Sequence, residues 1–335
     1  MTYAVPMLRP IRAPGFLLLS LAAACTDGGG SGDGGTTTGT SSTAAATTTG
    51  GGTASGTGTG TASGAGTGTA SGTGTGTASD TGTGTATTTG GTTGGGAPWS
   101  PPPGTSWQWQ LTETIDTTVD VVMYDIDLFD VPQATLDALH ADGRVVICYF
   151  SAGSYEEWRP DAGDFPQSAL GNPLDGWPGE RWLDIRDPGV RAVQAARLDM
   201  AAARGCDGVE PDNVDGYAND SGFDLTAQDQ IDYNTWLAEQ AHARGLSVGL
   251  KNDLDQVTQL EPLFDWALNE ECVAYDECDL LAPFIDAGKA VFHVEYVDNT
   301  ADGPAKANAV CPVTAPLSFS SLIKRWDLDA WRLPC

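Results

Sequence analysis

The stretch GCDGVEPDNVDGY, residues 205–217, says more about the fold and function of this chain than any other. A short apolar start runs directly into acids and an amide, which is poor material for a hydrophobic core. Side chains alternate between the two faces of a strand, so Glu210 and Asp212 would point the same way. Two carboxylates that face one region at a strand's end suit acid/base or nucleophilic chemistry on a sugar. The alternative is a solvated turn, because Asp, Asn and Gly favour turns.

Around this stretch, strand patterns alternate with helical ones, which favours a parallel sheet with helical crossovers. Strands are expected at 107–111, 119–124, 145–150, 207–210, 246–250, 264–268, 290–294 and 317–320, and helices at 133–141, 190–204, 226–243 and 280–287. Glycines stand where helices should give way to strands, at Gly143, Gly205, Gly245 and Gly288. Eight strands in this order predict a (β/α)₈ (TIM) barrel. A doubly wound open sheet is the alternative, but no G-x-G-x-x-G follows the first strand.

Polar side chains stand at the ends of most of these strands. In a (β/α)₈ barrel the carboxyl ends of the strands carry the active site. We therefore expect a shared group of substrate-binding residues at one mouth of the barrel: Asp125, Asp127, Tyr149, Ser151, Glu210, Asn213, Lys251, Asn252, Asp253, Glu295 and Tyr296. Lys251 would orient a carboxylate, and the two tyrosines would either line the site or simply pack.

Residues 26–97 consist almost entirely of Thr, Gly, Ser and Ala and include four near-identical octads from Thr53. Such a tract has too little apolar surface to offset the entropy of ordering, so it predicts a disordered linker. Ser/Thr-rich tracts are also frequent sites of O-glycosylation. The folded domain is therefore expected over residues 98–335.

Residues 1–25 have the pattern of a secretory signal peptide. Arg9 and Arg12 precede an apolar run that is too short to span a bilayer, and small residues lead to Cys25. Cys25 resembles the lipidated cysteine of a bacterial lipobox, although Leu21 is one position further away than usual. Thr26 then favours an outer-membrane or cell-surface lipoprotein. Ordinary cleavage and secretion is the alternative.

The formal net charge of the chain is −28, and residues 98–335 hold nearly all of it, with 14 basic and 41 acidic side chains. This balance excludes nucleic acid as a partner, because nucleic-acid binding needs a basic face. It fits a cationic substrate, or simply a soluble acidic surface. No cofactor motif is present, and the chain's three histidines do not stand at metal-ligand spacing with a cysteine pair, so no metal site is expected.

Six cysteines follow Cys25, an even number that suggests disulfides in an exported domain, although 15 pairings are possible. Cys272 and Cys278 are close enough to clip one loop, and Cys311 and Cys335 could fasten the C-terminal end. Cys148 and Cys206 either pair or remain buried thiols.

Five strings in this order resemble the extracellular endo-α-1,4-polygalactosaminidases, glycoside hydrolase family 114: YDIDLFD, VICYFSAGSYEEWRPD, GVEPDNVDGY, GLKND and NEEC. The resemblance covers about residues 107–297 and implies a (β/α)₈ barrel with an acidic cleft that cleaves galactosamine-containing polysaccharide. De-acetylated galactosamine is cationic, which matches the acidic excess. The resemblance places the two catalytic carboxylates on Asp212 and Glu270.

In such an enzyme one carboxylic acid protonates the leaving oxygen while one carboxylate attacks or activates water. We expect Asp212 to be the nucleophile or base and Glu270 the acid, with Glu210 as the main rival for either role. Trp158, Trp177 and Trp182 either form a stacking platform for sugar rings or cover the core of their own loop. The competing functions are a non-catalytic carbohydrate-binding barrel and a hydrolase of a different glycan.

Overall fold

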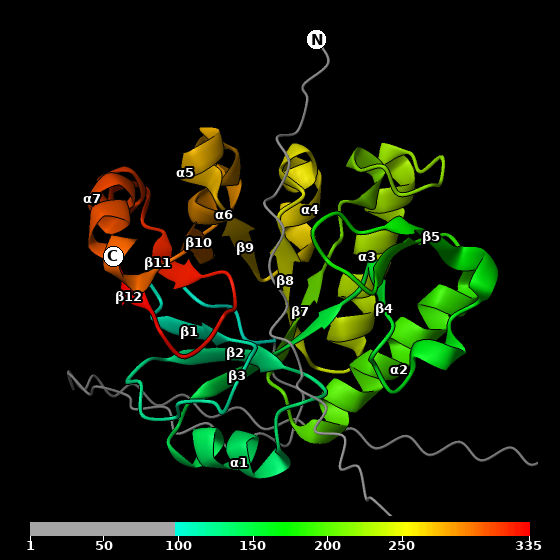
Figure 1. The fold of residues 1–335 in the computed structure, drawn as a ribbon, viewed down its shortest axis with the longest axis horizontal. Coiled ribbons are helices and arrows are strands. Elements are labelled where there is room, and N and C mark those ends of the chain that lie inside the picture. The colour runs from blue at the N-terminus through cyan, green and yellow to red at the C-terminus, as the bar shows by residue number, and fades with distance from the viewer. Residues whose placement is uncertain (1–97) are drawn as a thin grey trace, which may run out of the picture. The chain divides into compact units, whose positions relative to one another are not determined.

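The computed structural model describes residues 98–335 of the chain. The expected signal peptide, Cys25 and linker lie outside this part. Its main sheet contains eight parallel strands paired in chain order, as predicted for the barrel (Figure 1). They are β1 (Trp107–Gln110), β2 (Met123–Asp127), β3 (Val145–Ser151), β7 (Gly208–Asp212), β8 (Ser247–Lys251), β9 (Trp266–Glu270), β10 (Val291–Val297) and β11 (Ser320–Arg325).

Helices surround the curled sheet on its outer side (Figure 1). They are α1 (Gln133–Ala141), α2 (Pro188–Arg204), α3 (Ala227–Ala243), α4 (Val257–Leu260), α5 (Cys272–Tyr275), α6 (Ala282–Asp286) and α7 (Gly303–Thr314). The start of α3 follows directly from its sequence, because Thr226 and Asp229 cap each other's backbone N–H groups. The four predicted cap glycines all have positive φ. None of the helices in the described part is long and apolar enough to cross a membrane.

The barrel is completed by the C-terminal segment and not by a direct ladder between β1 and β11, which residues 98–335 do not contain. Strand β12 (Leu333–Pro334) pairs antiparallel with β11. The carbonyl of Leu328 accepts hydrogen bonds from the backbone N–H groups of Leu111 and Thr112, just beyond β1. The C-terminal segment therefore fills the gap between the first and last barrel strands.

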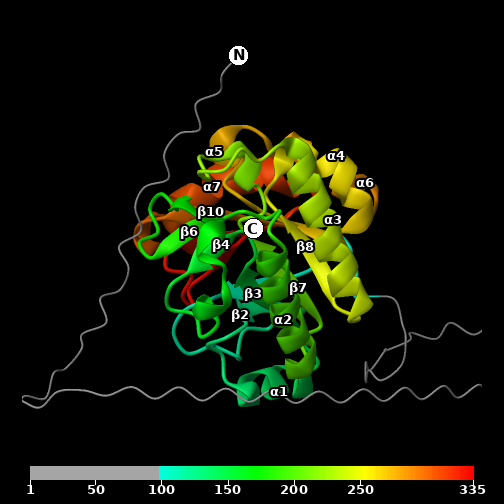
Figure 2. The same cartoon turned by 90° about the vertical axis from the view of Figure 1, so that its right-hand side faces the viewer.

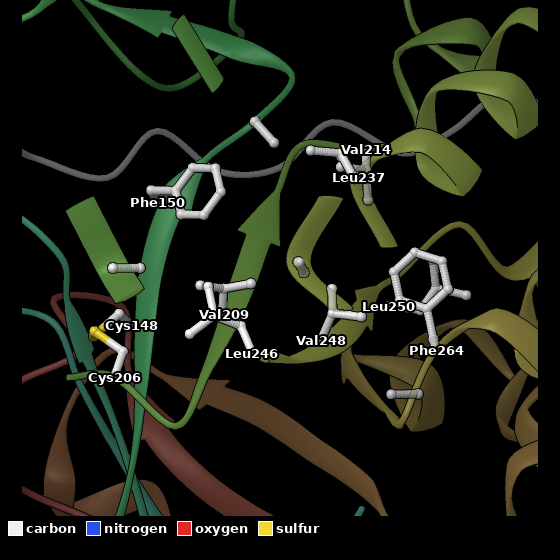
Figure 3. Packing of buried hydrophobic residues seen from close by; sticks show 14 of the residues in the cluster. Cys148, Phe150, Cys206, Val209, Val214, Leu237, Leu246, Val248, Leu250 and Phe264 are labelled. Atoms are coloured by element: carbon white, nitrogen blue, oxygen red, sulfur yellow. A yellow bond between two sulfur atoms is a disulfide. The ribbon is translucent and has the colours of Figure 1, made fainter. Parts of the chain in front are cut away.

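Two hydrophobic clusters lie on the two sides of the curled sheet, one inside the barrel and one outside it. Inward-facing side chains such as Trp107, Trp266 and Phe292 form one cluster. Outward-facing side chains of β3, β7 and β8 pack with the helices in the other, where Figure 3 shows Val209 beside Leu246 and Leu237 of α3 beside Val214. Both faces of the sheet are covered by other side chains. The strands therefore appear in the sequence as continuous apolar runs and not as alternating apolar and polar residues.

Most barrel strands end later than the apolar pattern predicts. The expected strand at 119–124 is wrong in its bounds, because the strand runs from Met123 to Asp127 and includes two aspartates. The expected strand at 317–320 is also misplaced, since residues 315–317 form a 3₁₀ turn before β11. The inner face of the barrel becomes polar near its mouth, so a polar residue there does not mark a strand's end.

The long connection from β3 to α2 contains a second sheet that the sequence did not indicate. Strands β4 (Ser154–Glu156), β6 (Glu180–Leu183) and β5 (Leu170–Pro173) pair antiparallel in that order. Figures 1 and 2 show this small sheet on the β3–β7 side of the barrel. Helices α4, α5 and α7 were also not predicted, and the expected helix at 280–287 is shorter because its first turn is a 3₁₀ turn.

All six cysteines of the described part form disulfides. The two suggested pairs, Cys272–Cys278 and Cys311–Cys335, are confirmed. Cys148 and Cys206 also pair, which settles the alternative of buried thiols and links β3 to the residues just before β7 (Figure 3).

Candidate active site

The side chain of Lys251 lies at the centre of the polar group inside the barrel mouth. Its Nζ is 2.8 Å from Glu210 Oε1, 3.1 Å from Asp212 Oδ1 and 3.4 Å from Glu270 Oε2. These residues come from β7, β8 and β9, three neighbouring strands. Lys251 and Glu210 are almost completely buried, whereas 19% of the Asp212 side chain and 28% of the Glu270 side chain are exposed. A substrate at the mouth can therefore reach Asp212 and Glu270 but not the pair beneath them.

Asp212 is the last residue of β7, and its carboxylate accepts several hydrogen bonds. The Tyr149 hydroxyl donates to Oδ2 at 2.9 Å, and the backbone N–H of Asn213 donates to Oδ1 at 2.8 Å. Asn213 has φ of 60°, a left-handed conformation that turns the chain sharply after the strand. Burial and the nearby Asp212 charge raise the pKa of Tyr149 well above its usual value, so its phenol remains a neutral donor.

Glu270 ends β9 and has its own set of donors. The Tyr296 hydroxyl donates to Oε1, and the Asn252 side chain donates to Oε2 at 3.1 Å. Burial and the Glu270 charge raise the pKa of Tyr296 well above its usual value. The Trp326 ring stacks on Tyr296 with the ring centroids 4.0 Å apart. This stacking restricts rotation of the Tyr296 ring and keeps its hydroxyl directed at Glu270.

The shared lysine limits the separation of the two exposed carboxylates. Because Lys251 Nζ lies 3.1 Å from Asp212 Oδ1 and 3.4 Å from Glu270 Oε2, these oxygens are no farther apart than the sum, 6.5 Å. Glycosidases that retain configuration have carboxyl groups about 5–5.5 Å apart, and inverting enzymes about 6.5–9.5 Å. The bound applies to one oxygen of each carboxylate, so it allows the retaining arrangement and reaches the inverting range only at its lower edge.

Glu210 and Asp125 form a buried layer under this pair. The Trp109 indole N–H donates to Glu210 Oε2 at 3.0 Å. Asp125 has no exposed surface, and neither of its carboxyl oxygens accepts a hydrogen bond from a donor in the described residues. Burial and the adjacent Glu210, which lies within hydrogen-bonding reach, raise the pKa of Asp125 well above its usual value. The burial of Asp125 and Glu210 does not fit the direct sugar contacts expected from the sequence.

Further acids with shifted pKa values surround the exposed pair. Burial, helped by neighbouring carboxylates, raises the pKa of Asp215 to about 6, of Glu271 to about 7, of Glu180 to about 8 and of Asp253 to about 9. Asp253 accepts a hydrogen bond from Asn234 at 2.9 Å, but its other oxygen is buried without a donor. These four acids add to the carboxyl groups already gathered around Lys251 at this end of the barrel.

Two expected sugar-binding acids are engaged elsewhere. Asp127 holds Arg159 at 2.6 Å and is nearly buried. Glu295 is fully buried, accepts the backbone N–H groups of Val273 and Ala274 at the start of α5, and pairs with Lys306 at 2.7 Å. These contacts engage both carboxylates inside the protein, and substrate binding by Asp127 and Glu295 stays a prediction.

Ser151 is likewise buried and connects the site to the small sheet. Its hydroxyl accepts the Asn213 side chain at 2.9 Å and bonds the Ser154 hydroxyl at 2.6 Å. Ser154 in turn donates to Glu180 Oε2 at 2.6 Å. This chain of contacts braces the turn that follows Asp212.

Sequence reasoning missed several residues of the site. Glu271 is the second acid of the NEEC motif and was passed over although its neighbour was chosen, and Asp215 lies within the opening stretch itself. Glu180, Trp109 and Trp326 carry no local signal, because only the tertiary structure brings their distant segments to the barrel mouth.

One group in the described residues has ligand atoms close enough for a metal ion: Cys272, Cys278 and His293. Both of its sulfurs are joined in a disulfide, so neither is a thiolate that could bind the ion.

An eight-stranded barrel with two reachable carboxylates held by neutral phenols at the carboxyl ends of its strands has the parts for acid-assisted cleavage of a glycosidic bond. This places the protein among the glycoside hydrolases. The sequence profile of glycoside-hydrolase family GH114 matches residues 88–335, and the chain belongs to that family.

Solved structures support this membership. Ega3 of Aspergillus fumigatus, in complex with galactosamine, is 48% identical, with a TM-score of 0.69 over 72% of this chain and 99% of Ega3. The glycoside hydrolase domain of PelA from Pseudomonas aeruginosa is 12% identical, with a TM-score of 0.56 over 70% of this chain and 98% of that domain, and shares the fold. Curated protein sequences gave no match.

Proposed function

We propose that this glycoside hydrolase cleaves internal bonds of an α-1,4-linked polysaccharide that contains de-acetylated galactosamine. The observation that carries the proposal is the pairing of Asp212 and Glu270, the two exposed carboxylates around Lys251. The likeness to Ega3, solved with galactosamine, supports the sugar. The concentration of acids at the same mouth supports the cationic form of the polymer.

In the proposed reaction the Asp212 carboxylate attacks the anomeric carbon as Glu270 protonates the leaving glycosidic oxygen. The bond to the leaving sugar breaks and a covalent glycosyl ester forms on Asp212. Glu270, now a carboxylate, takes a proton from water, whose oxygen displaces Asp212 and releases the product with retained configuration. Both carboxylates accept two hydrogen bonds, and Asp212 suits the nucleophile because its oxygen lies nearer to the Lys251 ammonium, which favours the charged form, than that of Glu270 does.

The neighbouring groups hold this pair in place. Tyr149 and Tyr296 each orient one carboxylate, and the Lys251 ammonium lowers the repulsion between them. Glu210 anchors Lys251 from below. We assign Asn213 and Asn252 to positioning as well, since their N–H groups donate to the catalytic carboxylates.

The partly exposed acids Asp215 and Glu271 would bind the ammonium groups of the sugar through charge-assisted hydrogen bonds. A nearby ammonium lowers the pKa of each carboxyl, so binding would draw both toward their charged forms. Glu271 has φ of 62°, and a strained backbone of this kind persists mainly where function requires it.

Residues 1–97 carry the remaining part of the proposal. We infer export, with Cys25 as the lipidated first residue and residues 26–97 as a tether that holds the domain away from the membrane. Three disulfides in the described residues support an oxidising compartment.

The test is hydrolysis by Asp212→Asn and Glu270→Gln variants on galactosamine polymer. Each change keeps the shape and removes an ionisable group, so each should fold normally and lose about 10²–10⁴-fold or more of the rate. A substrate whose leaving group needs no protonation should restore the Glu270 variant and not the Asp212 variant. Nuclear magnetic resonance of the first product should show the retained anomer, and fully N-acetylated polymer should be cleaved more slowly.

Asp142→Asn is the matched control, because Asp142 is exposed just before β3, at the opposite end of the barrel. It should keep full activity. If both site variants still cleave the polymer, the catalytic pair is misassigned. If the wild type binds the polymer without cleaving it, the domain is a binding module.

A further inference from the structure

The small sheet presents two exposed tryptophans. Trp158 has 52% and Trp177 has 38% of its surface exposed, more than any other tryptophan in the described residues. Burying a large apolar side chain stabilises a fold, so two indoles left in solvent within one connection contribute little to folding. Exposed apolar groups gathered in one place usually mark a binding surface.

Contacts around Gly179 bring the two tryptophan segments together. The backbone N–H of Glu157 donates to the Gly179 carbonyl at 3.1 Å. A Cβ on Gly179 would lie 3.0 Å from both Glu157 Oε1 and Trp158 Cζ3, so these two side chains cover that glycine. Trp177 stands two residues earlier in the same turn, and its carbonyl accepts the Glu180 N–H at 3.1 Å. We call Glu157, Trp158, Asp175 and Trp177 the tryptophan patch.

The backbone beside the patch is held firmly. Arg159, directly after Trp158, is buried and pairs with Asp127 at 2.6 Å and Glu156 at 2.8 Å. A ring on a fixed backbone loses less freedom when it binds a ligand, which lowers the entropic cost of binding.

The charge of the patch is acidic. Glu157 and Asp175 are exposed, whereas Arg159 is engaged in its buried ion pairs. Arg181 is exposed on β6, but its guanidinium donates to the carbonyls of Leu170 and Gly171. Indole faces attract ammonium groups and carboxylates bind them, so the patch combines two groups that recognise a cationic amino sugar.

The patch is continuous with the active site through β4. Ser154, the first residue of β4, bonds Ser151, which holds the Asn213 side chain beside Asp212. Strand β4 runs from Ser154 to Glu156, and a turn in which the Arg159 N–H donates to the Glu156 carbonyl at 3.2 Å places Trp158 just beyond the far end of β4. We expect a polymer that extends from Asp212 along β4 to reach the patch and a short substrate to stop before it.

We propose that the tryptophan patch is a remote subsite that binds a galactosamine unit of the polymer away from the bond being cleaved. This inference rests on the proposed function and adds the segment of the enzyme that holds the long substrate. The small sheet, whose strands β4 and β6 are labelled in Figure 2, would then extend the binding surface for the polymer beyond the barrel mouth.

The test compares polymer with a short activated galactosaminide in Trp158→Ala, Trp177→Ala and the double variant. Each single change should raise KM for de-acetylated polymer about 2- to 5-fold, and the double change more, because an exposed cation–aromatic contact is lost. Turnover of the short substrate should not change. Trp158→Phe and Trp177→Phe, which keep an aromatic face, should retain most of the polymer affinity.

Two further measurements make the result decisive. Glu157→Gln with Asp175→Asn should weaken the dependence of polymer KM on salt, since fewer charges are then screened. Val122→Ala, a comparably exposed apolar change before β2, is the control for surface effects. An unchanged polymer KM in the double variant overturns the inference, as does an equal loss on the short substrate. If the wild type cleaves only the short substrate, the proposed polymer is wrong. The patch is then tested separately by measuring polymer binding to Asp212→Asn with both tryptophans present and with both replaced by alanine. Equal binding by the two proteins overturns the inference.

Discussion

At the scale of single residues, the charge balance inside the barrel mouth depends on a proton. Lys251 is the one cation in contact with Glu210, Asp212 and Glu270 among the described residues, and Asp125 adds a fourth carboxyl beneath them. Several like charges cannot all remain ionised in a buried space. Lys251 favours the charged form of Glu210, whereas Asp125 has no donor, so the proton belongs on Asp125, which donates it to Glu210.

The first prediction concerns this proton. Asp125→Asn keeps a donor toward Glu210 and should retain the stability and the activity of the wild type. Asp125→Ala leaves Glu210 without that donor and should lower the free energy of unfolding by about 1–3 kcal/mol. Several raised carboxyls of this protein are protonated at neutral pH, so the infrared measurement is a difference: a protonated-carboxyl band of the wild type should be missing from Asp125→Asn and kept in Glu210→Gln. Identical spectra for the wild type and Asp125→Asn would mean that Asp125 is ionised.

At the scale of elements, glycines on the inner faces of the barrel strands make room for large aromatic residues. Gly249 of β8 stands beside Trp266 of β9, and a Cβ at Gly249 would lie 2.2 Å from the indole. Trp266 is completely buried, and its N–H donates to Ser247 at 3.0 Å. The indole therefore cannot move aside without losing a hydrogen bond and its packing in the inner cluster.

We expect Gly249→Ala to lower the free energy of unfolding by about 1–3 kcal/mol, measured by urea denaturation, because the extra methyl overpacks the barrel interior. Gly163→Ala is the matched control, since nothing lies within 4 Å of its added methyl. If the only effect of the alanine were to reduce the conformational entropy of the unfolded chain, either variant would be as stable as the wild type or more stable. A Gly249→Ala protein as stable as the control would show that the barrel wall yields to the methyl.

At the scale of the whole molecule, the concentration of acids at one end of the barrel couples stability to pH. Burial raises the pKa of Glu210 and Glu271 to about 7, of Glu180 to about 8 and of Asp253 to about 9. Lys324 acts in the opposite direction, since burial lowers its pKa to about 7. The folded protein thus holds more protons than the unfolded chain between the ordinary carboxyl pKa and these raised values.

The stability of the protein should therefore fall as pH rises. Below the ordinary carboxyl pKa near 4 the acids are protonated in both states, so burial carries no charge penalty there. Between about pH 5 and 8 the unfolded chain has already lost the protons that the fold still holds, and the free energy of unfolding should drop by about 2 kcal/mol or more. Urea denaturation across this range measures the slope, with Lys324 contributing a smaller rise above pH 7. A flat or rising profile between pH 5 and 7 would contradict the buried-acid argument.

The sequence by itself determined the order of the eight barrel strands and of helices α1, α2, α3 and α6, the barrel class and the motifs that hold Asp212 and Glu270. Those features depend on local apolar runs, cap glycines and strings of neighbouring residues, which are visible in one dimension. Only the tertiary structure decided which polar residues share a site: it buried Asp125 and Glu210, engaged Asp127 and Glu295 in structural contacts, and brought Glu180, Trp109 and Trp326 to the mouth. The physical reason is that burial and charge pairing depend on contacts between distant segments. A polar side chain near a strand's end has the same local pattern whether it faces a substrate, an arginine or another acid.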